Sequence, residues 1–138
     1  MKEKLKVIKI IHLALCSGVI LAYIFLGNVS DITNFDITNI DSSDIVYLLI
    51  PFLAYFLSNF LFKSQLKNID TTLDIEENFQ FYQTASLTRW AILEGAAFAI
   101  LFMKRDFMIL GVLIILYLIF LRPTLDRIKT DLAKKRLN

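Results

Sequence analysis

Glu94 has the clearest capacity for chemistry in this chain, because it lies in the most apolar stretch. Between Arg89 and Met103 it is the one acidic residue among apolar and small residues. An ionised carboxylate in the middle of a bilayer costs roughly 2.5–3.5 kcal/mol on insertion scales, and protonation, pairing with a cation or contact with a water-filled cavity relieves that cost. Glu94 is therefore a candidate proton-binding or cation-binding residue. The alternatives are a static hydrogen-bonding residue and a contact for a lipid or small ligand.

Four other polar residues could share a site with Glu94. Arg89 is the nearest basic residue, but five helical positions correspond to roughly 140° around the axis, so the two residues do not share a helix face. We expect His12, Asn59 and Arg89 in the cytoplasmic third of the membrane. Glu94 should lie deeper, at the same depth as Ser17. Together these residues predict a polar track that enters from the cytoplasm and ends at the carboxylate.

Small residues recur four positions apart in two segments, with one constant offset between corresponding positions: Ala14, Gly18 and Ala22, then Ala91, Gly95 and Ala99. At that offset His12 corresponds to Arg89, and Ser17 corresponds to Glu94. Helices in lipid approach each other closely where small residues line the contact. We therefore expect the two helices that carry these stripes to touch each other there, or one stripe to serve a neighbouring subunit.

The composition is that of a membrane protein. Of the 138 residues, 57% are hydrophobic, whereas soluble domains are typically about 45–50% apolar. Four apolar blocks are long enough, or nearly so, for the roughly 17–25 helical residues that cross a bilayer. They span residues 8–27, 45–62, 84–103 and 107–121, and the last is short.

We expect an all-α membrane protein with four transmembrane helices, arranged as two tandem helical hairpins, about 5–67 and 74–130, in a single integral membrane domain over 1–138. Basic residues gather before the first block, between the second and third, and after the fourth, whereas Lys104 and Arg105 lie on the other side. The positive-inside rule then places both termini in the cytoplasm. The hairpins would run in the same direction, as parallel repeats.

Segments outside the blocks carry further predictions. The loop 28–44 holds four Asp and no basic residue, which is typical of a solvated external loop. Acidic residues from Asp74 onward predict that the third helix begins there and projects from the membrane. Near the C-terminus, Leu125, Ile128 and Leu132 form an apolar stripe among basic residues. This pattern predicts a basic amphipathic tail, lying on the inner leaflet or docked on the protein's own cytoplasmic segments.

The remaining patterns argue against an enzyme. No cluster of His, Cys and carboxylates has metal-ligand spacing, and no Gly-rich phosphate loop is present. His12 is the single histidine, and the single cysteine, Cys16, excludes an intrachain disulfide. The net charge of +2 comes largely from the inside-facing basic residues, which favours membrane lipids as partners over nucleic acid. We expect no cofactor, no metal and no nucleic-acid partner.

Two stretches carry a family resemblance: His-Leu-Ala-Leu-Cys-Ser-Gly-Val-Ile at 12–20 and Thr-Arg-Trp-Ala-Ile-Leu-Glu-Gly-Ala-Ala-Phe at 88–98. They resemble the hallmark stretches of small, mostly uncharacterised four-helix inner-membrane proteins of Bacteroidota-type bacteria. This resemblance covers the whole chain and implies its fold and location, but no activity.

A more remote similarity concerns the intramembrane acid. Tandem hairpins with a Glu followed by small residues are similar to the proteolipid c subunits of rotary ATPases, in which such a Glu binds the transported proton or sodium ion. Here the acid lies in the first helix of its hairpin instead of the second, and the first apolar block lacks the dense glycine repeat that allows ring packing. The similarity therefore implies cation binding at Glu94 and does not extend to a ring.

The sequence thus favours a non-enzymatic, multi-pass inner-membrane protein, either an oligomer or a subunit of a membrane assembly, with Glu94 as the candidate proton-binding or cation-binding site. Two alternatives stay open. One is a purely structural or assembly subunit held by small-residue helix packing. The other is a membrane enzyme that handles a lipid or quinone, with Arg89 and Glu94 in its pocket.

Overall fold

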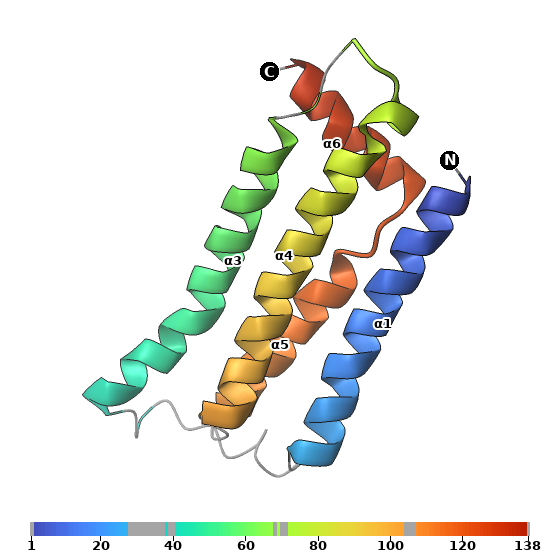
Figure 1. The fold of residues 1–138 in the computed structure, drawn as a ribbon. Helices are drawn as coiled ribbons and strands as arrows, with labels where there is room; N and C mark the ends of the chain where they lie inside the picture. The colour runs from blue at the N-terminus through green and yellow to red at the C-terminus, as the bar shows by residue number, and fades with distance from the viewer. Residues whose placement is uncertain are drawn as a thin grey trace.

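A computed structural model describes residues 2–27, 38, 41–67, 69, 72–103 and 107–137 of the chain. These residues form five α-helices and a short 3-10 helix, and none of them is in a strand (Figure 1): α1 (Lys2–Leu26), η2 (Ser42–Asp44), α3 (Ile45–Leu66), α4 (Ile75–Met103), α5 (Met108–Phe120) and α6 (Leu125–Leu137). The all-α prediction is confirmed for this part of the chain. Lys104, Arg105 and most of the predicted loop 28–44 lie outside the described residues.

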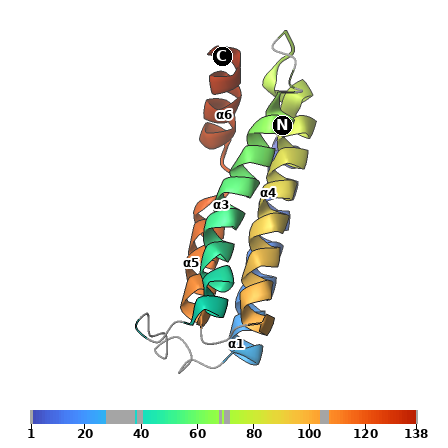
Figure 2. The same cartoon turned by 90° about the vertical axis from the view of Figure 1, so that its left-hand side faces the viewer.

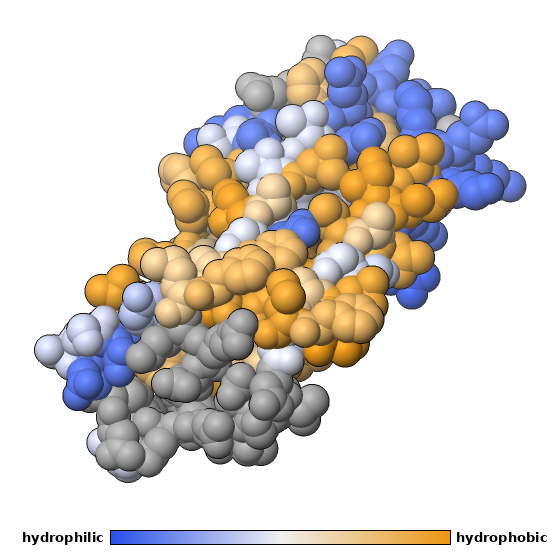
Figure 3. All heavy atoms as spheres, turned by 60° about the horizontal axis from the view of Figure 1, so that its bottom comes forward, coloured by the Kyte–Doolittle hydropathy of each residue, from blue (hydrophilic) through white to orange (hydrophobic). Residues whose placement is uncertain are grey.

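Within the described ranges, three helical segments are long and apolar enough to cross a membrane: α1, η2 together with α3, and α4. The 13 residues of α5 extend about 20 Å at 1.5 Å per residue, and a bend of 87° separates α5 from α6. If α5 and α6 are counted together as one bent span, they make a fourth. Figure 3 shows apolar side chains over the middle of the bundle and hydrophilic ones gathered toward its ends. Length, composition and surface together fit a bundle surrounded by lipid.

α4 is the central helix of this bundle. It packs against α1, α3 and α5, and α6 also contacts it. In Figure 1, α4 lies between α1 and α3, and Figure 2 shows α5 and α6 on one side of it. This arrangement differs from the predicted pair of hairpins, because α4 separates the two helices of the first one. The reason is that α4 carries large or polar side chains on two adjoining faces, Tyr82 and Arg89 on one and Trp90 on the other, and each of them is buried.

α1 approaches α5 closely at Gly111. The Tyr23 hydroxyl of α1 donates a hydrogen bond to the Ala97 carbonyl of α4 at 2.5 Å, and the Tyr23 side chain is buried. A Cβ atom added to Gly111 would collide with the Tyr23 ring. Tyr23 therefore fixes three helices at one point, and that point has room for no side chain on α5.

Polar caps set where α4 and α6 begin. Asp74 and Glu77 form a reciprocal capping pair: the Glu77 amide donates to Asp74 Oδ1 at 2.8 Å, and the Asp74 amide donates to Glu77 Oε2 at 3.1 Å. This confirms that the third long helix begins near Asp74. At α6, the Arg127 amide donates to Thr124 Oγ1 at 3.2 Å, which caps the turn after Pro123.

α6 docks on the protein itself. Ile128 and Leu132 of its apolar stripe are 0% and 2% exposed. The Tyr82 hydroxyl of α4 donates a hydrogen bond to Asp131 Oδ2 at 3.4 Å. The sequence predicts that the basic tail lies either on the inner leaflet or on the protein itself. In the structure it docks on the protein, and its apolar stripe is buried there.

We expect Gly111→Ala to lower the free energy of unfolding by about 1–3 kcal/mol, because the new methyl group overpacks the contact with Tyr23. Gly18→Ala is the matched control: Gly18 also lies inside a long helix, and a Cβ there meets nothing within 4 Å. Denaturant unfolding of the purified protein in detergent measures both. Equal stability of the two variants would contradict the close approach.

Candidate functional site

Glu94 lies inside α4 at the outer edge of its contact with α1. Its side chain is half-buried, whereas the adjacent Leu93 is buried in the core. Trp90, one turn earlier, packs on His12 of α1 with a ring-centroid distance of 4.7 Å. The Glu94 carboxylate makes no hydrogen bond or ion pair with any residue that the structure describes. An acidic group thus stands within the apolar part of the bundle without a hydrogen bond or ion pair from the described segments.

A polyvalent metal site is not assembled around this carboxylate. Among the described residues, no group of three or more His, Cys, Asp or Glu side chains comes together in metal-binding geometry. Hard divalent cations take six or more oxygen ligands, of which Glu94 supplies at most two. What Glu94 can do by itself is accept a proton, or contribute one ligand to a cation whose other ligands come from elsewhere.

The small-residue stripes lie on the outside of the bundle. Ala14, Gly18, Ala91 and Gly95 are exposed, and a Cβ added to either glycine meets nothing within 4 Å. The other two members, Ala22 and Ala99, are half-buried. The prediction that the stripes form the contact between these two helices is therefore wrong. Contact with a neighbouring subunit stays a prediction.

The actual contact between α1 and α4 explains this correction. It is made by larger side chains that also need hydrogen bonds or ring contacts: His12 with Trp90, and Tyr23 with the Ala97 carbonyl. Aromatic rings bring a large contact area to a helix interface, and the Tyr23 hydroxyl and His12 Nε2 find carbonyl acceptors there. Each helix therefore turns its aromatic face inward, and the small residues, which lie on another face, point outward.

His12 is a buried hydrogen-bonded residue. Its Nε2 donates to the Leu118 carbonyl of α5 at 2.8 Å, and the Cys16 sulfur lies 3.6 Å from the same nitrogen. Since its ring also contacts Trp90, His12 ties α1 to both α4 and α5. Its surroundings are those of a packing residue.

Asn59 and Ser17 lie apart from Glu94. Asn59 is in the seam between α3 and α5, where its amide nitrogen donates to the Tyr55 carbonyl at 2.8 Å and to the Tyr117 hydroxyl at 3.0 Å. Ser17 is exposed on the outer side of α1, next to the buried Cys16. The structure therefore distributes the predicted polar track over separate seams and does not join it into one path.

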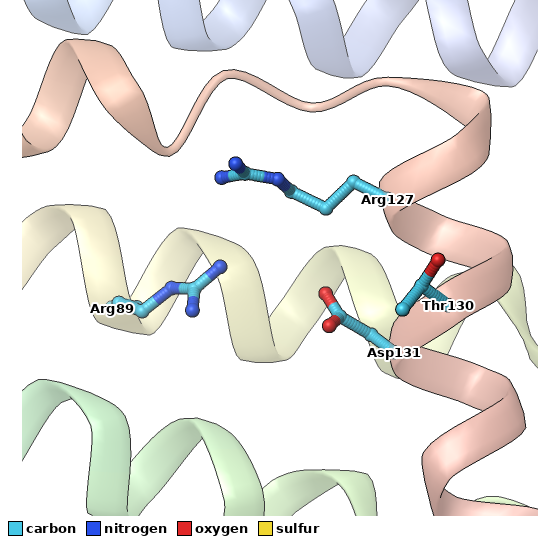
Figure 4. Close-up of a pocket in the computed structure, with 4 residues that line it drawn as sticks. All are labelled: Arg89, Arg127, Thr130 and Asp131. Atoms are coloured by element: carbon cyan, nitrogen blue, oxygen red, sulfur yellow. The ribbon is translucent and has the colours of Figure 1, made fainter.

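Arg89 lies on a different face of α4 from Glu94, as the helical spacing predicts. It is 6% exposed, and its guanidinium carbon lies 3.7 Å from the centroid of the Phe62 ring of α3. Its Nε is fully buried and has no hydrogen-bond partner in the described part of the chain. Arg89 borders a pocket of about 330 Å³ whose other described lining residues come from α6, namely Arg127, Thr130 and Asp131 (Figure 4). Glu94 is not among them, so the alternative with both residues in one pocket loses its support.

The α6 side of this pocket was missed in the sequence, although a signal existed. Arg127 and Asp131 are four positions apart and directly precede Ile128 and Leu132 of the apolar stripe. Polar residues at the border of a buried stripe lie where two elements meet. What the spacing alone could not give is the element that α6 meets, and hence the proximity of these residues to Arg89.

No protein family, curated protein or solved structure matches this chain significantly. The fold of the part of the chain that the structure describes defines the class: an all-helical bundle with three helical segments, or four with the bent pair, that are long and apolar enough to span a membrane. The two resemblances described above stay predictions.

We expect His12→Phe to lower the free energy of unfolding by about 1 kcal/mol, because a ring remains beside Trp90 but the hydrogen bond to Leu118 is lost. Ser17→Ala on the exposed side of the same helix should change nothing. Unfolding in detergent measures the stability, and the emission of Trp90, the single tryptophan, reports the local packing. Unchanged stability and emission in His12→Phe would show that this contact does not hold the helices together.

Proposed function

We propose that this chain is a non-enzymatic, multi-pass protein of the bacterial inner membrane, with both termini in the cytoplasm, that works as an oligomer or as a subunit of a membrane assembly. In this proposal Glu94 binds a proton or a monovalent cation. The observation that carries it is the half-buried Glu94 carboxylate inside an apolar helix, without a hydrogen bond or ion pair from any described residue.

The energetic argument starts from the surroundings of the carboxylate. Its helix neighbours Leu93 and Ala97 are buried apolar residues. At that position an uncompensated charge costs roughly 2.5–3.5 kcal/mol, so the stable states are a protonated carboxyl or a carboxylate beside a cation. Exchange between those two states is the elementary step of proton or cation binding.

The outer face of α4 supports the assembly half of the proposal. Ala91 and Gly95 are exposed next to Glu94, and the exposed Gly95 offers no side chain to keep another helix away. A helix from a neighbouring subunit that packs on this face would approach the backbone closely and would cover the carboxylate. Such a helix could also supply the polar groups that complete a cation site.

The same face favours the alternative, a purely structural assembly subunit. In that case the helix that packs at Gly95 would satisfy Glu94 with a permanent hydrogen bond, and no ion would exchange. The two functions differ in whether Glu94 titrates or exchanges ions in the intact assembly, and each has its own test.

The ion-binding function predicts that a hydrophobic carbodiimide, which reacts with protonated carboxyl groups in apolar surroundings, modifies Glu94 in membranes. The cation that the site binds should slow this reaction. Glu94→Gln should abolish the adduct while the protein still folds, and Asp126→Asn, a change of an exposed carboxylate on α6, should leave it intact. Intact-mass measurement follows the adduct. If Glu94 stays unmodified across mildly acidic to alkaline pH, the proton-binding proposal is contradicted.

The assembly function predicts that Gly95→Leu shifts the protein toward smaller species, because a large side chain blocks close approach of another helix. Folding should be unaffected, since nothing lies within 4 Å of a Cβ at this position. Gly18→Leu tests the stripe on α1 in the same way. Mass measurement of the complex in mild detergent reads out both. A wild-type monomer that is indifferent to both changes would remove the assembly function.

A further inference from the structure

The pocket between α4 and α6 brings two guanidinium groups to one space. Figure 4 shows Arg89 from α4 and Arg127 from α6 with their guanidinium groups directed into the pocket, and Asp131 opposite them. Two like charges that face one cavity repel each other unless an anion lies between them. Asp131 supplies one carboxylate, which already accepts a hydrogen bond from Tyr82. Counting Arg89, Arg127 and Asp131, the lining keeps an excess of one positive charge.

Arg89 is the group that requires an explanation. It is 94% buried, since 6% of its surface is exposed, and its Nε has no hydrogen-bond partner among the described residues. Its contact with Phe62 covers one face of the guanidinium plane and leaves the N–H edge directed toward the pocket. A buried, charged donor without an acceptor is costly, whereas a bound oxyanion would satisfy it.

Arg127 is held so that most of its donors remain available. One Nη1–H donates to the Phe120 carbonyl at the end of α5 at 2.9 Å, and the guanidinium carbon lies 4.9 Å from the Phe120 ring centroid. A guanidinium has five N–H donors, so this bond orients the group without exhausting it. The Thr130 hydroxyl also borders the pocket, although it donates to the Asp126 carbonyl at 2.8 Å and so adds mainly an acceptor.

We propose that this pocket binds a phosphate group, held between the guanidinium groups of Arg89 and Arg127. Planar guanidinium groups match the oxygens of a phosphate, which accept paired hydrogen bonds. α6, which lines the pocket, lies at the end of the bundle where α1 begins (Figure 1), and the first turns of α1 carry Lys2, Lys4 and Lys6. At such a basic boundary of a membrane bundle, the abundant source of phosphate is the headgroup of an anionic phospholipid. A soluble phosphate ion is the second source of the same chemistry.

The test uses the full-length protein in a neutral detergent, titrated with short-chain phosphatidylglycerol or with inorganic phosphate at constant ionic strength. Binding is read by native mass spectrometry and by the shift in thermal stability. We expect wild type to bind phosphatidylglycerol, Arg127→Gln to bind about tenfold more weakly, and Asp131→Asn to bind more tightly because a competing carboxylate is removed. Arg122→Gln is the matched control, an exposed basic residue between α5 and α6 that does not line the pocket.

The outcomes separate the sources of phosphate and can overturn the site. If inorganic phosphate does not compete with phosphatidylglycerol, the ligand is a lipid headgroup; if it competes and binds alone with the same dependence on the variants, the ligand is a soluble phosphate. Equal binding by wild type, Arg127→Gln and Asp131→Asn would overturn the proposal. So would weaker binding by Arg122→Gln alone, because the attraction would then come from surface charge. The result does not depend on Glu94, which lies outside the pocket.

Discussion

A helix in apolar surroundings must bury its polar side chains against other parts of the protein. In this chain α4 is the helix on which the fold depends for this reason. Tyr82 and Arg89, about two turns apart, share one face of α4, Trp90 lies on the adjoining face, and all three are buried. Three neighbouring helices cover them: α3 meets both Tyr82 and Arg89 through Phe62, α6 meets Tyr82 through Asp131, and α1 meets Trp90 through His12. The central place of α4 follows from these separate needs, since one neighbouring helix could not meet all of them.

Two charged side chains of α4, Glu94 and Arg89, are not fully satisfied by the neighbouring helices, and both are candidates for function. On the outer side of α4, Glu94 is half-buried beside the exposed Gly95, and no described residue pairs with its carboxylate. On another face of α4, Arg89 is buried, and its Nε has no hydrogen-bond partner among the described residues at the pocket between α4 and α6. An acid in the apolar part and a cation near the basic end are physically distinct sites. The first suits a proton or cation, and the second suits a phosphate group.

Much of this could be predicted from the sequence, because helix periodicity and capping are local. The start of α4 near Asp74, the buried stripe of Ile128 and Leu132, and the separation of Arg89 from Glu94 around one helix all follow from spacing. The partners of each face could not be predicted, because lipid and protein interior are both apolar and the hydrophobic pattern does not distinguish them. For that reason Gly18 and Gly95 were expected at a contact within the chain but lie outside, and the residues of α6 that border Arg89 were missed.

The most direct test of the account is which helix lies next to α1. The native Cys16 faces the bundle on α1, and a second cysteine can be placed at a buried alanine, either Ala97 on α4 or Ala54 on α3. Treatment of membranes with a short bifunctional thiol reagent then reports proximity as an intrachain cross-link, detected by mass. With α4 in the centre, the Ala97→Cys variant cross-links to Cys16 and the Ala54→Cys variant does not. Cross-linking of Ala54→Cys but not of Ala97→Cys would mean that α1 and α3 form a packed hairpin, and would contradict the central position of α4.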